Sequence, residues 1–161
     1  MSLTNILFME PVYIQQTYDQ DYQHCFGCGP KNEEGLHIKS YPINEGKQTK
    51  CTFTPDKKFS GGHPHNVYGG MIAMLFDCHG TASAAYFHLV DKGLPFNEET
   101  VIRRFVTAHL EVDFRKPTPQ GVELTVIAEP IELGERKVVL KMQLFAGDKL
   151  CAESTMVAVG L

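Results

Sequence analysis

The sequence has no apolar run that approaches the ~20 residues of a membrane-spanning helix, and it has no excess of basic residues. Its 15 Lys and Arg residues stand against 19 Asp and Glu residues, which gives a formal net charge of −4. Nucleic-acid-binding domains usually carry a basic excess, so the composition argues against that class. No basic and apolar leader typical of secretion is recognisable. We therefore expect a cytoplasmic protein without a membrane span or a nucleic-acid partner.

Cysteines are few and odd in number. The chain has five, and without a secretion signal free thiols are expected rather than a disulfide framework. Cys25 and Cys28, with His24 and His37 nearby, look like half of a zinc site. Structural zinc takes four ligands, and a second pair usually supplies the other two. The remaining cysteines do not form such a pair: Cys51, Cys78 and Cys151. We expect a tight turn with two buried thiols, no metal, and Cys78 in the core.

Hydrophobic periodicity divides the chain into an irregular lead-in, residues 1–35, and a single domain, residues 36–161. Two strands are expected over 36–41 and 49–54. A helix is expected from about Gly69 to Leu89, because apolar residues recur at alternating spacings of four and three. The residues of this stripe are Met71, Leu75, Cys78, Ala82 and Ala85. The polar segment 91–104 is expected to form a loop or a short extra helix.

Alternating apolar residues predict four further strands, over 108–114, 122–129, 137–144 and 150–159. We interpret these four as a meander. One helix with one apolar stripe needs the inner face of one antiparallel sheet to cover it. The inventory therefore predicts an α+β fold, in which a curved antiparallel sheet of five or six strands wraps around one long central helix.

Two features of the predicted helix suggest a catalytic site. Gly69 and Gly70 open it, and their backbone amides can donate to a negative charge or to a polarised carbonyl. Asp77 is an acid inside an otherwise apolar helix, where a carboxylate needs a compensating role. A rise of ~1.5 Å per residue places the Gly70 amide ~11 Å from Asp77, too far for both to contact one carbonyl. A catalytic role therefore predicts two antiparallel helices, one from each copy of a dimer, that form shared sites.

Three segments resemble the hotdog-fold thioesterases, in the branch of small acyl-CoA thioesterases similar to the phenylacetate-pathway enzyme. Tyr68-Gly69-Gly70 followed by Asp77 falls on that family's His-Gly-Gly motif and its catalytic acid. The segment VTAHLEVDFRKP, 106–117, is similar to the family's third strand, and CFGCGPKNEEGL, 25–36, is similar to a lead-in segment in part of the superfamily. The resemblance implies a hotdog fold and hydrolysis of acyl-CoA thioesters, with coenzyme A as part of the substrate and no other cofactor.

Roles for individual residues follow from the resemblance. It implies that Asp77 is the nucleophile or the general base, and that Gly70, with Gly69, donates to the oxyanion. Tyr68 stands where the family has His; its phenol can donate a hydrogen bond that orients the thioester, but it cannot be a cation near neutral pH. Thr107 matches the family's Ser or Thr that assists the acid. By strand alternation Thr107 lies on the polar face, so it reaches the site only if the regular strand begins after it.

Two groups of residues are expected to contact the substrate. The first lies in the loop before the helix: His63, His65 and Asn66. The second consists of candidates for the phosphates of coenzyme A: Arg115 and Lys116, with Arg103 and Arg104. The segment 91–104 is interpreted either as a lining of the acyl pocket or as a hydrophobic anchor for its own loop. We expect a homodimer or a dimer of dimers. Two other functions stay open. One is a non-catalytic acyl-CoA-binding or assembly module, which Tyr68 suggests. The other is a hotdog dehydratase or hydratase, for which the acid lies too deep in the helix.

Overall fold

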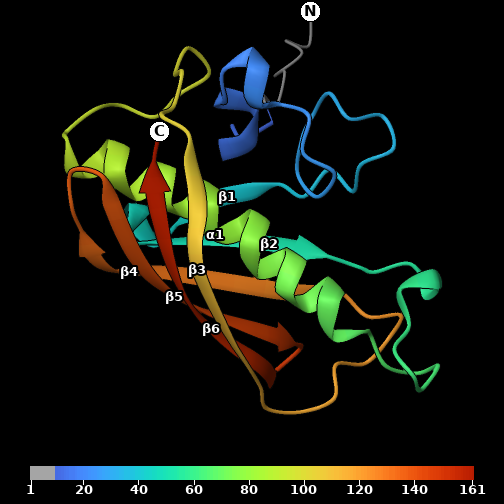
Figure 1. Ribbon diagram of the computed structural model, residues 1–161. Helices are drawn as coiled ribbons and strands as arrows, with labels where there is room; N and C mark the ends of the chain where they lie inside the picture. The colour runs from blue at the N-terminus through green and yellow to red at the C-terminus, as the bar shows by residue number, and fades with distance from the viewer. Residues whose placement is uncertain (1–9) are drawn as a thin grey trace, which may run out of the picture.

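The structure is a computed structural model that describes residues 10–161. Over this range a six-stranded antiparallel sheet curves around one long α-helix, which confirms the expected α+β hotdog architecture (Figure 1). The helix α1 spans Gly69–Asp91, and the strands are β1 Ser40–Ile43, β2 Gln48–Phe53, β3 Phe105–Phe114, β4 Leu124–Leu133, β5 Lys137–Ala146 and β6 Lys149–Gly160. Short 3₁₀ helices are η1 Ile14–Thr17, η2 Gln20–Tyr22, η3 Asn44–Gly46 and η4 Lys57–Phe59.

The strand order in the sheet is β1-β2-β4-β5-β6-β3. β4, β5 and β6 form a meander, but β3 pairs with β6, so the predicted four-strand meander is wrong. A hairpin from β3 to β4 would need a short turn. The connecting segment 115–123 instead crosses to the loop before α1, where Val67 N donates to Thr118 O at 2.9 Å and Asn66 bridges Pro119. As a result β3, ten residues long, forms one edge of the sheet.

Helix α1 is the centre of the core. The five residues of the predicted stripe are all buried, as expected: Met71, Leu75, Cys78, Ala82 and Ala85. The opposite side is buried as well, for example at Phe76 and Phe87, because the lead-in packs there through Ile14 and Tyr18. A fully buried side chain of this size stabilises the fold by about 1.5–3 kcal/mol. The helix is therefore enclosed between the sheet and the lead-in.

Close approach of α1 to the sheet depends on a small residue in mid-helix. A Cβ at Gly80 would lie 2.6 Å from Met156 Cε and 2.9 Å from Met142 Cε. Both methionines are buried on the inner face of the sheet. The two methionine side chains fill the space that the glycine leaves, so α1 packs against β5 and β6 without a gap.

A polar network is buried between α1 and the strands β1 and β2. His79 is fully buried, and its ring contacts Ser40 Oγ at 2.8 Å and Thr49 Oγ1 at 3.3 Å. Thr49 Oγ1 lies 2.6 Å from Ser83 Oγ, and Gln15 Nε2 donates to Ser40 Oγ at 2.9 Å. Burial lowers the pKa of His79 to about 4. His79 is thus a neutral packing residue whose hydrogen bonds connect the lead-in, the sheet and the helix.

The expected first strand begins later than the pattern suggested. Residues 36–39 are not part of β1, because His37 adopts φ 52° and the backbone of this segment pairs with the turn before it. Leu36 N donates to Phe26 O at 2.8 Å, and Ile38 N donates to Gly27 O at 3.0 Å. Among residues 10–161, no helix combines the length and the apolar character that a membrane crossing needs.

Candidate active site

The N-terminus of α1 offers backbone donors to solvent. Tyr68 is the N-cap residue, with an extended backbone and no side-chain cap. Met71 N donates to Tyr68 O at 3.1 Å, but within residues 10–161 the amides of Gly69 and Gly70 donate to no protein acceptor. The positive end of the helix dipole lies at the same place. This end of α1 can therefore stabilise a negative charge or a polarised carbonyl oxygen.

Two aromatic rings pack on the glycine pair. A Cβ at Gly70 would lie 2.2 Å from Tyr68 Cε2, and a Cβ at Gly69 would lie 3.3 Å from Phe114 Cζ. Tyr68 is 43% exposed and Phe114 57% exposed. Both exposed rings therefore flank the free amides.

An open groove of about 500 Å³ lies beside this helix start. It brings together six of the predicted site residues: His63, Asn66, Tyr68, Gly69, Arg115 and Lys116. His65 does not line the groove; its ring stands 5.2 Å from that of His63. Sequence reasoning missed Ile72, Phe114 and Thr118, which also line it. The only signal for these three was their position next to the motif residues.

Arg115 and Lys116 give the groove positive charge, but they are engaged differently. Arg115 Nε donates to Glu153 Oε2 at 2.9 Å, and its Nη2 lies 3.5 Å from Asp113 Oδ2. Lys116 forms no ion pair with any residue in 10–161. The lysine ammonium therefore remains available for an anionic ligand at the mouth of the groove.

Asp77 lies two turns further along α1 and does not line the groove. It is half-buried, and its Oδ1 accepts a 2.5 Å hydrogen bond from Thr107 Oγ1 on β3. The structure thus brings Asp77 and Thr107 together, as the resemblance implied. It does not bring Asp77 to Gly69 or Gly70 within one chain, since the helical rise separates them by ~11 Å.

Thr107 reaches Asp77 through a β-bulge. The expectation that the regular strand must begin after Thr107 is wrong, because β3 begins at Phe105. The pairing with β6 shifts between Thr107 and His109, so Ala108 is the extra residue. One extra residue reverses the alternation, which places Thr107 on the same inner face as Leu110 further along the strand. Alternation read from the sequence alone could not show this reversal.

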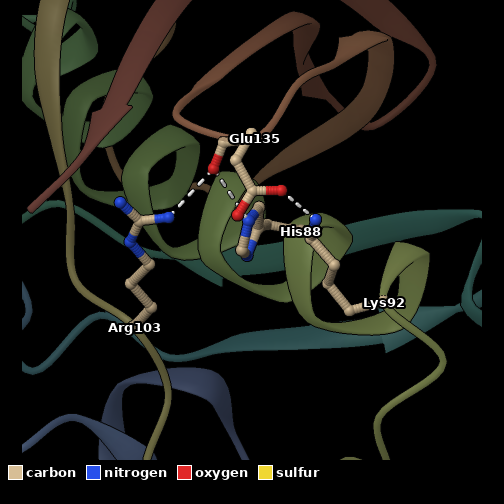
Figure 2. A network of polar contacts seen from close by, with 4 residues as sticks. All are labelled: His88, Lys92, Arg103 and Glu135. Atoms are coloured by element: carbon tan, nitrogen blue, oxygen red, sulfur yellow. Dashed lines mark hydrogen bonds and ion pairs between the residues drawn. The ribbon is translucent and has the colours of Figure 1, made fainter.

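Arg103 lies beside the C-terminal end of α1, near His88 and Lys92 (Figure 2), whereas the groove lies at the N-terminal end. Its side chain donates to Leu161 O at 3.0 Å and to Glu135 O at 2.9 Å. The same Glu135 carbonyl lies 3.1 Å from His88 Nε2, and the Glu135 carboxylate pairs with Lys92. These contacts fasten the end of α1 to the turn between β4 and β5. The structure does not place Arg103 at the groove of its own chain.

The remaining candidates from this region also have contacts within the fold. The Arg104 guanidinium lies 4.8 Å over the ring of Tyr18 in the lead-in. In the loop 91–104, Phe96 packs edge-on against Tyr86 with ring centroids 5.3 Å apart. The loop contains no extra helix. Phe96 therefore fits the second interpretation of this segment, in which it is a hydrophobic anchor for its own loop.

Comparison with protein families finds a match over residues 65–153 to the family described as the thioesterase superfamily. This span is more than half of the chain and includes Tyr68, Asp77 and Thr107. A search of the curated proteins finds no match.

Solved structures with the same architecture are numerous. A thioesterase superfamily protein from Shewanella loihica PV-4 is 40% identical, with 89% of this chain and 99% of that chain covered and a TM-score of 0.65. The E. coli PaaI protein of the phenylacetic acid degradation operon is 18% identical, with 78% and 80% covered and a TM-score of 0.62. A Streptococcus mutans UA159 protein bound to acetyl CoA is 14% identical, with 71% and 82% covered and a TM-score of 0.57. The last two are similar in fold alone.

Proposed function

The chain belongs to the thioesterase superfamily, and we propose that it hydrolyses acyl-CoA thioesters as a homodimer with two shared sites. Asp77 is the catalytic carboxylate, and the amides that open α1 are the oxyanion donors. The observation that carries the proposal is the hydrogen bond from Thr107 Oγ1 to Asp77 Oδ1. Helix α1 has two carboxylates, Asp77 in its middle and Asp91 at its last residue. The hydrogen bond holds the Asp77 carboxylate at a fixed place on the inner side of the sheet edge.

The reaction consumes one water and releases a carboxylic acid and the thiol of coenzyme A. With Asp77 as general base, its carboxylate takes a proton from water while the water oxygen bonds to the thioester carbon. The carbon–sulfur bond then breaks, and the leaving thiolate takes up the proton. With Asp77 as nucleophile, its oxygen displaces the thiolate to give a mixed anhydride, which water hydrolyses. Both routes pass through an oxyanion, for which a backbone donor is needed.

Gly69 is the donor that the groove favours. Gly69 lines the groove, whereas Gly70 does not, and the ring of Tyr68 packs where a Cβ at Gly70 would lie. Amide donors at a helix start keep their direction throughout the reaction, so they stabilise developing charge without reorganisation. Tyr68, at the rim, can donate its phenol proton to the thioester. The sequence placed Gly70 first and Gly69 second, and the geometry of the groove supports the reverse order.

Dimerisation through the β3 edge completes the site. An exposed strand edge of ten residues is a template for pairing with another chain. If two copies of β3 pair antiparallel around Leu110 and Glu111, Thr107 of one copy falls opposite Phe114 of the other. Phe114 packs on Gly69, so this pairing brings the groove of one copy to Asp77 of the other. The pairing removes the ~11 Å gap that separates the two groups within one chain.

Coenzyme A fits the chemistry of the groove. Lys116 and Arg115 can meet its phosphates, and His63 and Asn66 add polar contacts at the mouth. Thr118, buried beside the groove, has a hydroxyl without a partner in residues 10–161. The S. mutans relative in fold binds acetyl CoA, which supports this class of ligand for the scaffold.

Release of free thiol from a panel of short, long and aromatic acyl-CoAs tests the proposal. Asp77→Asn keeps the shape of the side chain but removes the carboxylate, and we expect it to abolish turnover while the circular dichroism and unfolding temperature stay close to those of the wild type. Asp91→Asn is the matched control, because Asp91 is exposed at the other end of α1. Turnover in the Asp77→Asn variant equal to that of the control would contradict the mechanism.

A second candidate function rests on Tyr68. A phenol in place of the family His cannot become a cation near neutral pH, which favours a module that binds acyl-CoA without hydrolysing it. Such a module would bind the thioester tightly and release no thiol with any acyl group. The same panel separates the two functions, because only the hydrolase shows release that depends on Asp77.

A further inference from the structure

Three thiols converge where the lead-in meets α1. Cys25 and Cys28 come from one turn of the lead-in and Cys78 from the helix, and their sulfur atoms all lie within 4.8 Å of one another. The Cys25 and Cys78 sulfurs are 3.8 Å apart, and the cysteines are free thiols. The expectation drawn from the sequence required a second pair of cysteines for a metal site, and it therefore assigned Cys78 to the core alone.

The turn Cys25-Phe26-Gly27-Cys28-Gly29 is shaped to press against the helix. A Cβ at Gly27 would lie 2.3 Å from Cys78 Sγ, and a Cβ at Gly29 would lie 2.4 Å from Cys25 N. Gly29 N donates to Cys25 O at 2.8 Å and closes the turn. Larger residues at either glycine would separate the three sulfurs, so the local sequence maintains their approach.

The sulfur of Cys25 is surrounded by possible hydrogen-bond donors. These are the thiols of Cys28 and Cys78 and the backbone amides of Cys28 and Gly27. Amide donors directed at the first sulfur of a Cys-x-x-Cys turn stabilise negative charge on it.

Two buried polar groups beside the thiols lack partners. Neither the hydroxyl of Tyr18 nor Nη1 of Arg104 makes a hydrogen bond within residues 10–161, although both atoms are shielded from solvent. Tyr18 is 3% exposed. Arg104 lies 4.8 Å over the same ring. Unpaired groups of this kind are costly. Thiolate sulfurs held by a bound cation would offer an acceptor to Arg104, and the open position of the cation would offer a partner to the Tyr18 hydroxyl.

We propose that Cys25, Cys28 and Cys78 bind one Zn²⁺ ion, with the fourth position of its tetrahedron facing the hydroxyl of Tyr18. Zinc–sulfur bonds of ~2.3 Å in a tetrahedron place sulfurs ~3.8 Å apart, which is the Cys25–Cys78 separation. The third sulfur needs to move by at most about 1 Å to match. Soft thiolate ligands also select this class of cation.

Charge balance favours Zn²⁺ over Cu⁺, the other cation that thiolates prefer. Three thiolates with Zn²⁺ carry one negative charge, and the Arg104 guanidinium neutralises it. Three thiolates with Cu⁺ would leave one negative charge uncompensated in a buried place, which is unfavourable. The ion would join the lead-in to the residue that follows Asp77, so it would hold the N-terminal segment against the turn of α1 that carries the carboxylate. The proposal does not depend on the proposed hydrolysis.

Zinc binding by the full chain tests the proposal directly. The protein is stripped with a chelator under reducing conditions and then titrated with Zn²⁺ alone or Cu⁺ alone, and retained metal is measured by mass spectrometry. We expect one Zn²⁺ per chain, a higher unfolding temperature with zinc, and thiolate-to-metal charge-transfer absorption when Co²⁺ replaces Zn²⁺. Cys25→Ser, at a half-buried position, loses all three signals, whereas the control Cys151→Ala, a buried cysteine outside the cluster, keeps them.

Three results would overturn the proposal. In the first, the reduced wild type retains no more zinc than Cys25→Ser does. Retention of Cu⁺ with no retention of Zn²⁺ is the second. The third is an equal loss of zinc in Cys151→Ala and in Cys25→Ser, since a non-specific thiol contribution would then explain the binding. Circular dichroism of both variants shows whether they are folded, and Cys78→Ala provides a second variant if Cys25→Ser is not.

Discussion

Thr107 Oγ1 donates a 2.5 Å hydrogen bond to Asp77 Oδ1 and so joins the edge strand β3 to the middle of helix α1. The bond exists because a bulge at Ala108 turns Thr107 to the inner face of the sheet. A threonine that donates to a carboxylate fixes which oxygen remains free for substrate or water. Thr107 is thus a positioning residue, and Asp77 is the group that reacts.

Replacing Thr107 by Val removes this bond and keeps the shape of the side chain. Hydrogen bonds to charged groups contribute about 1.5–3 kcal/mol, so kcat should fall about ten- to hundredfold while KM changes little. Thr107→Ser restores the hydroxyl and should restore most of kcat, which a purely structural role would not predict. Thr155→Val on the exposed face of β6 is the control for a loss of polarity on the sheet. Steady-state thiol release with the four proteins measures the effect.

Gly69→Pro removes a backbone N–H without breaking the helix. Position 69 is the first residue of α1, where proline is tolerated, and Tyr68 already has the extended backbone that precedes proline, with φ −72° and ψ 148°. Loss of one oxyanion donor lowers kcat by about 10²–10³. Gly69→Ala keeps the N–H and should retain activity after a small shift of the exposed Phe114 ring. Equal activity in the two variants would show that the Gly69 amide does not take part.

Acid should weaken the fold through His79. Burial lowers its pKa from 6.5 in the unfolded chain to about 4, so the unfolded state binds the proton more readily. The free energy of unfolding therefore decreases as pH falls from about 6.5 to about 4, by about 3 kcal/mol in total. Urea unfolding over this range measures the slope. His79→Gln should remove that slope, and His24→Gln, an exposed control, should retain it.

Carboxylates contribute to acid instability in a lower window. The pKa of Glu129 is lowered first by its hydrogen bond from Gln48, and the pKa values of Glu135 and Glu153 are lowered by Lys92 and Gln143 respectively. A folded pKa below the ordinary value of 4.5 means that their stabilisation is lost as pH falls below that value. A decrease in the free energy of unfolding between about pH 6.5 and 5 is therefore assigned to His79.

The sequence predicted α1 well because two local signals agree there. The Gly69-Gly70 pair marks the start, and the stripe from Met71 to Ala85 has the helical period. Alternation was equally clear in β5, where Val138 and Leu140 are fully buried. These patterns depend only on neighbours in the chain, which is why they can be read without a structure.

What the sequence could not show depends on contacts between distant segments. The place of β3 at the sheet edge follows from its pairing with β6, and alternation carries no information on partners. One residue, Ala108, decides whether Thr107 faces Asp77. The convergence of Cys78 with Cys25 likewise exists only once the lead-in packs on the helix. Each is a tertiary relationship that local periodicity does not encode.

The central claim is that each site takes its carboxylate from one chain and its groove from another, and complementation tests it most directly. Asp77→Asn and Gly69→Pro each inactivate one half of every site. When the two inactive proteins exchange subunits in equal amounts, half of the dimers are mixed, and each mixed dimer holds one intact site. The account predicts that thiol release rises to about a quarter of the wild-type rate. No rise above the two separate variants, after subunit exchange is verified by native mass spectrometry, would contradict it.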